Sequence, residues 1–254
     1  MRLHRSLEPA FAAALLSFAS AGCRAEDAAP PREPAQWPEL GLMGTVPLYW
    51  GEQAAFGDAL SGGGTAHWAR AQLEARYTLR PLDTLSDVSF ADLKFLLLAQ
   101  PRALSGPENV ALDAWVRAGG RVLLFADPLL TGESRFPIGD RRRPQDVILL
   151  SPILAHWGLR LEFDDGQPNG FTLAAGEAPI PVNLPGRFLA DGDCAAESGG
   201  VLARCAIGRG RVLVLADAAL LDLYQPHPAA PAALDWLLEQ GFGDGKPRET
   251  PAVH

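Results

Sequence analysis

The stretch KFLLLAQPRALSGPENVALDAWVRAGGRVLLFADP, residues 94–128, decides the fold class of this chain. It begins with an apolar run at 94–99, continues through a helical pattern, and ends with a second apolar run at 121–126. Uninterrupted apolar runs of this length are typical of strands buried on both faces, and strand–helix–strand units build parallel sheets. The sequence therefore predicts an α/β protein with three layers, in which helices cover both faces of a mostly parallel sheet.

The helix between these two strands has clear signals at both ends. Ser105 suits the N-cap position, Pro107 and Glu108 suit the first turn, and Gly119-Gly120 suits the end. The spacing predicts a polar stripe of Asn109, Asp113 and Arg117. It also predicts an inward face of Ala111, Ala114, Trp115 and Ala118.

The remaining elements follow from the same kinds of pattern. We expect short strands and turns over 164–200, which indicate a small antiparallel β extension, and no regular element over 129–145. The run RVLVLAD at 211–217 resembles RVLLFAD at 121–127, so we expect it to return to the main sheet as part of a hairpin. The other predicted strands lie at 45–50, 77–82, 159–163 and 201–206, and the other helices at 66–76, 147–157 and 231–240.

Bulk composition limits the classes of partner. The chain has 254 residues and a formal net charge of -8. Nucleic-acid binding needs a clustered basic surface, so we expect no nucleic-acid partner. The basic run Arg141-Arg142-Arg143 is flanked by Asp140 and Asp146, which favours a solvated loop.

The first residues are typical of an export signal. Two arginines precede a short apolar core at 10–19, which is too short to span a membrane. We expect a signal peptide at 1–22, a Pro/Ala-rich tether at 23–40, a single domain at 41–243 and a disordered tail at 244–254. The sequence SAGC at 20–23 indicates lipidation of Cys23, and ordinary cleavage after Ala21 is the alternative. Either way, we expect the mature protein in the periplasm, with a lipid anchor in the first case.

Two further cysteines are consistent with export. Cys194 and Cys205 flank a turn signal, and an even pair in an oxidising compartment suggests a disulfide. Two separate buried thiols are the alternative. A metal site is not indicated, because the chain has no Cys-x-x-Cys spacing and no His near either cysteine.

Three stretches together resemble a known family. They are the strand exit LLAQPRALS, the helix and strand WVRAGGRVLLFADP, and SPILAHWGLRLEFDD. In this order they resemble the periplasmic auxiliary domain of gliding-motility-type ABC transport systems, over roughly residues 41–218. The resemblance implies a class I glutamine-amidotransferase-like or flavodoxin-like fold. It also implies ABC permease and ATPase subunits as partners.

The ends of the predicted strands supply candidate ligand-binding residues. Open α/β sheets bind ligands at the carboxyl ends of their strands. An acid pair such as Asp127 and Asp217 can perform acid–base chemistry if burial raises one pKa, although aspartate also caps turns routinely. The candidates for a ligand cleft are Trp50, Glu52, Gln100, Arg102, Asp127, Asp217 and His227.

The sequence favours a non-catalytic domain. The fourth strand ends in Asp127-Pro128, with no Ser or Cys nucleophile, and one histidine with scattered acids is not a triad. The run Gly62-Gly63-Gly64 lacks the Lys-Ser/Thr of a P-loop, so we expect no cofactor. We therefore expect an accessory or binding domain of an ABC-type transport system. A periplasmic hydrolase that uses Asp127, Asp217 and His227 is the alternative.

Overall fold

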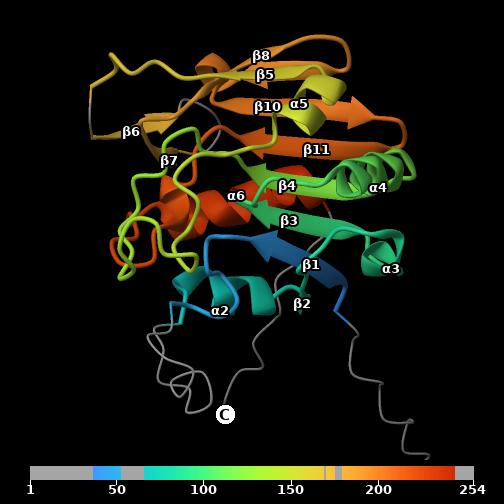
Figure 1. Cartoon of the computed structure of the whole chain (residues 1–254), viewed down its shortest axis with the longest axis horizontal. Helices are drawn as coiled ribbons and strands as arrows, with labels where there is room; N and C mark the ends of the chain where they lie inside the picture. The colour runs from blue at the N-terminus through green and yellow to red at the C-terminus, as the bar shows by residue number, and fades with distance from the viewer. Residues whose placement is uncertain (1–36, 53–65, 169, 175–178, 244–254) are drawn as a thin grey trace, which may run out of the picture. The chain divides into compact units, whose positions relative to one another are not determined.

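A seven-stranded sheet forms the centre of the computed structural model, which describes residues 37–52, 66–168, 170–174 and 179–243. The five strands from β2 to β11 in its order are parallel, and β10 and β9 continue the sheet in antiparallel fashion (Figure 1). The strands, in order across the sheet, are β2 (Thr78–Pro81), β1 (Glu39–Gly44), β3 (Phe95–Ala99), β4 (Arg121–Phe125), β11 (Gly210–Leu215), β10 (Leu202–Ile207) and β9 (Cys194–Glu197).

Helices cover both faces of this sheet, because side chains alternate between the two faces along each strand. Leu97 of β3 and Leu123 of β4 belong to the core on one face, and their neighbours Leu96 and Leu124 belong to the core on the other. Helices α2 (Trp68–Glu74) and α6 (Ala230–Phe242) pack on the first face, and α3 (Asp87–Phe90), α4 (Gly106–Arg117) and α5 (Ser151–Trp157) pack on the second.

The parallel strands, numbered by appearance, are arranged 2-1-3-4-5, which is the flavodoxin-like order. The direction of winding changes between β1 and β3, and α2 and α3 accordingly lie on opposite faces. In this order of strands, ligands bind at the carboxyl edge near that point.

Two small antiparallel sheets lie outside the main one. Strand β5 (Leu159–Glu162) pairs with β8 (Arg187–Ala190), and β6 (Phe171–Ala174) pairs with β7 (Ile180–Asn183). Two short 3-10 turns, η1 (Ser198–Gly200) and η2 (Ala219–Leu221), complete the described elements. The predicted α/β class, with a mostly parallel sheet and an antiparallel extension, is therefore confirmed.

The strand–helix–strand unit from 94 to 128 forms as predicted. Ser105 accepts the N–H of Glu108, and the Glu108 carboxylate accepts the N–H of Ser105, which completes a capping box. Gly119 follows the helix with a φ of 117°, in the region that glycine adopts most easily. The residues from 211 return beside β4 in parallel register, also as predicted.

The predicted first strand is wrong. Strand β1 occupies 39–44, so it begins inside the stretch predicted as tether, and the chain turns over 45–50. Gly41 and Gly44 lowered the apparent strand propensity of ELGLMG, yet the packing requires Gly44. A Cβ atom on Gly44 would lie 2.0 Å from the carbonyl oxygen of Ala99.

Two other predictions need correction. The deepest side chains of α4 are Leu112 and Val116, whereas Ala114 and Ala118 of the predicted inward face are exposed. Larger side chains gain more from burial, so the helix is rotated toward them. Helix α5 begins at Ser151 rather than at 147. The predicted signal peptide, Cys23, the glycine run 62–64 and the tail 244–254 lie outside the described residues.

Replacement of Gly44 by Ala tests the close approach of β1 and β3. We expect Gly44→Ala to lower the free energy of unfolding by about 1–3 kcal/mol, because the added methyl group meets backbone that has little freedom to move. Urea unfolding followed by circular dichroism measures this change. Gly106→Ala is the control, since a Cβ atom there meets nothing within 4 Å; equal stability of the two variants would contradict the close approach.

Candidate functional site

Three polar side chains lie buried at the carboxyl edge of the sheet. Gln100 directly follows β3, and Asp127 and Asp217 lie two residues beyond β4 and β11. All three have an exposed fraction of 0%. The three side chains therefore meet at one edge, as expected for the ends of parallel strands. Their hydrogen-bond partners determine what chemistry each side chain can perform.

Gln100 connects the end of β3 to the end of β4. Its Nε2 donates to the carbonyl oxygen of Asp127 at 2.9 Å, and its Oε1 accepts the N–H of Asp127 at 2.8 Å. The side-chain amide thus makes the same two hydrogen bonds that a backbone residue would make in the next pair of the sheet. The backbone of Gln100 has a φ of 48°, which is uncommon for a residue other than glycine. The side chain also donates from Nε2 to the carbonyl oxygen of Gln145 at 3.1 Å, so three hydrogen bonds fix Gln100 in this conformation.

Each oxygen of the Asp127 and Asp217 carboxylates accepts one backbone N–H group. Asp127 accepts the N–H of Leu129 at 2.8 Å through Oδ1 and that of Ala218 at 2.9 Å through Oδ2. Asp217 accepts the N–H of Ala219 at 2.7 Å through Oδ1 and that of Asn183 at 2.9 Å through Oδ2. Every carboxylate oxygen of the pair therefore holds a loop or a neighbouring element in place.

Burial makes this pair costly to ionise. Loss of solvent raises the pKa of Asp127 to about 6, against the smaller lowering effect of its two backbone donors. Burial, and then the charge of Asp127, raise the pKa of Asp217 well above its usual value. The two acids thus favour a state in which they do not both carry a charge.

Glu52 lies at the same edge of the sheet and is 2% exposed. Its Oε2 accepts the hydroxyl of Tyr224 at 2.8 Å and the N–H of Arg135 at 2.9 Å. Burial and the contact with Glu52 raise the pKa of Tyr224. The cavity beside Glu52 has a volume of about 20 Å³, and Leu130, from the polar insertion at 129–145, lies in its wall. A space of that size holds about one water molecule.

The other sequence candidates have different partners. Arg102 forms a two-point ion pair with Glu108, at 2.7 and 3.0 Å, so it stabilises the start of α4. His227 accepts the N–H of Ala229 just before α6. The ring of Trp50 is 66% exposed and contacts that of Tyr49 edge to face.

His67 is a buried residue that was not among the sequence candidates. Its Nδ1 accepts the N–H of Ala69 as the N-cap of α2, and its Nε2 lies 2.9 Å from the carbonyl oxygen of Leu221. Burial lowers the pKa of this imidazole to about 4. The neutral tautomer with a proton on Nε2 satisfies both contacts, so His67 connects α2 to η2. The helix was predicted to begin at 66, which placed His67 inside it, so no sequence signal marked this residue as a cap.

Cys194 and Cys205 face each other on β9 and β10 and form a disulfide, with their Cα atoms 4.0 Å apart. The bond joins the two antiparallel strands at the outer edge of the sheet. Among the described residues, no group of three or more His, Cys, Asp or Glu side chains is placed to hold a metal ion. In the same part of the chain, every helix is too short or too polar to cross a bilayer.

Comparison with known proteins supports a transport-associated domain. A family model described as "ABC-type uncharacterized transport system" matches residues 57–166. This match covers the βαβ unit and supports an auxiliary domain of an ABC-type transport system. No curated protein matches the chain.

Similar solved structures support the fold alone. The "mmIFT52 N-terminal domain" matches with a TM-score of 0.50 and 13% identity, over 85% of this chain and 99% of that one. A cold-adapted β-galactosidase from Rahnella sp. R3 matches with a TM-score of 0.46 and 11% identity, over 81% of this chain and 31% of that one. This chain thus spans about a third of the galactosidase, and the likeness is too distant to bear on activity.

The buried acid pair predicts an unusual dependence of stability on pH. The unfolded pKa of aspartate is about 3.9, so the folded protein binds more protons than the unfolded one between about pH 4 and 6. The pair therefore lowers the free energy of unfolding as pH rises through this window. His67 acts in the opposite direction, because its folded pKa lies below its unfolded value.

Asp217→Asn removes the pH dependence that comes from the ionisation of Asp217 in the acid pair and leaves the one that comes from His67. We expect the stability of the variant relative to the wild type to rise as pH increases from 4.5 to 7, because the variant has no buried carboxyl group at this position to ionise. The amide of Asn leaves one backbone N–H group without an acceptor, so this rise starts from a lower stability than that of the wild type. Urea unfolding of both proteins across this range measures the difference. Asp165→Asn, at an exposed position, is the control and should keep the wild-type profile. Parallel profiles for Asp217→Asn and the wild type would disprove the interpretation.

Gln100→Met tests the connection between β3 and β4. The substitution keeps the length of the side chain but leaves the N–H of Asp127 without its acceptor, while the carbonyl oxygen of Asp127 keeps the N–H of Ile148. We expect the free energy of unfolding to fall by about 1–3 kcal/mol, which is the cost of one buried unsatisfied group. Thermal and urea unfolding measure it. Gln72→Met, on the partly exposed surface of α2, should cost much less; similar losses would refute the special role of Gln100.

Proposed function

We propose that this chain is a non-catalytic accessory domain on the periplasmic side of an ABC-type transport system. The match of residues 57–166 to a family of such systems supports the association with transport. The flavodoxin-like strand order agrees with the class I glutamine-amidotransferase-like fold that the sequence resembles. In this proposal the domain binds a subunit of the transporter rather than converting a substrate.

One observation carries the non-catalytic part of the proposal. All four carboxylate oxygens of Asp127 and Asp217 accept backbone N–H groups, and neither residue is exposed. A general acid or base must reach the proton that it transfers, within hydrogen-bond distance or through one water molecule. The positions where a related enzyme would keep its nucleophile are filled by structural side chains.

A periplasmic hydrolase remains the second candidate, because the raised pKa values of the acid pair are typical of catalytic groups. Buried carboxyl groups with a purely structural role have raised pKa values for the same reason, namely the loss of solvent. The cavity of about 20 Å³ beside Glu52 offers no room for a substrate among the described residues. Burial for structural reasons therefore explains the shifts more simply.

We propose further that Cys23 carries the lipid anchor. The short apolar segment before it and the small residues at 20–22 are typical of a lipoprotein signal. A single acyl chain holds a protein weakly, whereas two or more chains hold it stably. The polar stretch from Cys23 would then connect the anchor to the folded domain.

Cross-linked purification of the tagged protein from native membranes tests the association. We expect permease and ATPase subunits of an ABC system to be recovered and identified by mass spectrometry. An unrelated lipoprotein of similar abundance is the control for proteins that share the membrane. We expect Cys23→Ala to reduce recovery at least several-fold, because the anchor brings the domain to the membrane surface.

Absence of transporter subunits from the purified material, with the protein well expressed, would contradict the accessory role. Hydrolysis of a chromogenic ester or glycoside by the wild type, and its loss in a folded Asp127→Asn variant, would favour the hydrolase instead.

A further inference from the structure

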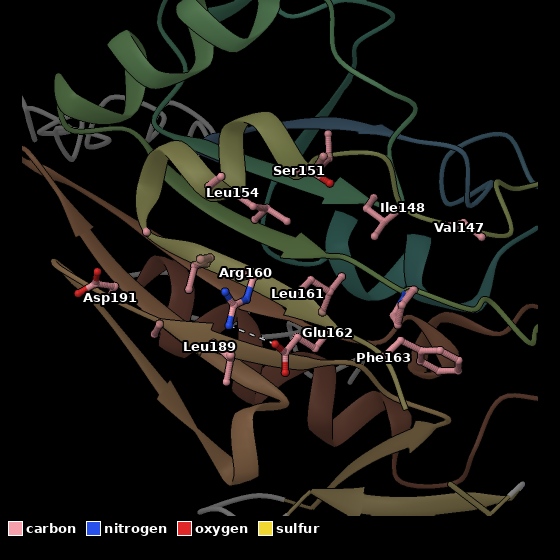
Figure 2. Close-up of a pocket in the computed structure, with 16 residues that line it drawn as sticks. Val147, Ile148, Ser151, Leu154, Arg160, Leu161, Glu162, Phe163, Leu189 and Asp191 are labelled. Carbon is pink, nitrogen blue, oxygen red and sulfur yellow. Dashed lines mark ion pairs between the residues drawn. The ribbon is translucent and has the colours of Figure 1, made fainter. Parts of the chain in front are cut away.

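Two hollows of similar size differ in the charges that line them. One lies between α5 and β5 and has a volume of about 620 Å³, and its Arg160 and Glu162 form an ion pair at 3.2 Å (Figure 2). The other lies beside the C-terminal half of α6 and has a volume of about 660 Å³. We call it the arginine pocket, because three arginines line it, namely Arg204, Arg209 and Arg211.

The arginine pocket lies on the face of the sheet that α6 covers. Leu213 of β11 belongs to the core on that face, and Arg211 points to the same side, because alternate side chains of a strand share a face. Arg204 of β10 is paired with Leu213, so it also lies on this face. Gln240 and Gly241 of α6 line the pocket as well. The sheet therefore forms its floor, and the end of α6 forms one wall.

Small side chains keep the floor of the pocket open. Arg204 lies opposite Ala195 in the register of β9 and β10. Arg211 lies opposite Ala206 in the register of β10 and β11. Both alanines line the pocket. An alanine beside an arginine on a sheet leaves space that a larger neighbour would fill, and here this space is part of the hollow.

The positive charge of the pocket is only partly compensated within the described part of the chain. Glu197 binds Arg204 through Nε alone, at 2.9 and 3.0 Å, which leaves the two terminal nitrogens as donors. Arg209 donates to one backbone carbonyl oxygen at 3.0 Å. Arg211 is exposed and forms no ion pair or side-chain hydrogen bond with the described residues. Asp193 is the single carboxylate among the described lining residues.

Arg211 also lies beside another cation. It is paired with Arg121 in the parallel register of β4 and β11, and Arg121 donates to the carbonyl oxygen of Phe242 at the end of α6. Like charges side by side on a sheet repel each other and lower stability. Arg121 thus has a structural contact, whereas Arg211 adds repulsion without one in the described part of the chain. Groups that reduce stability are typical of functional sites, and an anion beside Arg211 would offset the repulsion.

We propose that the arginine pocket binds the phosphate group of a small organic molecule. Each guanidinium group is a planar fork that binds two oxygens at once. One fork occupies both oxygens of a carboxylate, whereas a phosphate monoester has three terminal oxygens and up to two negative charges. Three arginines around one pocket therefore favour phosphate over carboxylate. A hollow of about 660 Å³ also has room for the organic part of the ligand. The proposal does not depend on the proposed transport function.

Isothermal titration calorimetry of the purified protein with glycerol 3-phosphate tests the proposal. The salt concentration is held at about 0.15 M, so that attraction over long distances is screened. We expect saturable binding by the wild type. Arg209→Gln and Arg211→Gln should each weaken it by about tenfold or more, because each removes one charged hydrogen-bonding fork. Arg141→Gln removes the same charge at an exposed arginine outside the pocket, so this control should bind like the wild type.

Urea unfolding of Arg211→Gln provides a second readout. We expect the free energy of unfolding to stay the same or to rise, because the substitution removes the repulsion with Arg121 and breaks no described contact. Loss of binding without loss of stability would separate a ligand-binding role from a structural one. A large loss of stability would show that Arg211 holds the fold and would overturn the proposal.

Vesicles that contain phosphatidic acid distinguish two sources of the phosphate group, with vesicles of phosphatidylcholine alone as their control. Binding of glycerol 3-phosphate without binding of these vesicles would assign the pocket to a soluble phosphate monoester. Binding of the vesicles that depends on Arg211 would assign it to a lipid headgroup. Absence of saturable binding to either probe would overturn the proposal. Equal weakening by Arg211→Gln and Arg141→Gln, or tighter binding of succinate than of glycerol 3-phosphate, would do the same.

Discussion

The carboxyl edge of the parallel sheet is held together by side chains that take the place of further backbone pairing. A sheet that is buried on both faces leaves backbone groups at its strand ends that water cannot reach, and each must find a partner. Gln100 supplies the partners for the end of β4, and the Asp127 carboxylate reaches the N–H of Ala218 beyond β11. Asp217 extends the connection to Asn183 at the end of β7. The polar insertion, and the loops that contain Glu52 and Tyr224, lie next to these contacts.

This arrangement explains why a fold that commonly places ligands at this edge offers little space there. In flavodoxin-like proteins the crevice near β1 and β3 is open to a ligand. Here the N–H of Thr45 donates to the carbonyl oxygen of Gln100 at 3.1 Å, and the Thr45 hydroxyl accepts the N–H of Gln145 at 2.9 Å. The polar insertion is thereby drawn onto the strand ends. A larger groove, with a volume of about 620 Å³, lies between α5 and β5.

Local signals predicted much of the fold. The βαβ unit was predictable because a cap, a proline and a glycine pair mark its helix, and because apolar runs mark its strands. Strand β1 was not, since its two glycines resemble a linker when read alone, although the close packing requires Gly44. The burial of Leu112 and Val116 was misjudged because alanines occupied a more regular stripe.

The candidate site was predictable only in part. Parallel strands bring their carboxyl ends to one edge, so the meeting of Gln100, Asp127 and Asp217 follows from the fold class. Their partners do not, because the donors to Asp127 and Asp217 include Ala218 and Asn183, which lie 91 and 34 positions away in the chain. Arg102 also follows a strand, yet Glu108 pairs with it at the first turn of α4. The nearest strong charge, rather than the edge of the sheet, determined its position.

Hydrogen exchange at four backbone amides tests the central claim most directly, namely that the buried acids hold the structure and do not serve a substrate. These amides belong to Leu129, Asn183, Ala218 and Ala219. NMR-detected exchange should show them protected to nearly the same degree as the amides of β4 and β11, although they lie in loops, at the start of η2 or at the end of β7. Exchange at the rate of exposed loop amides would show that the carboxylates are free to do something else.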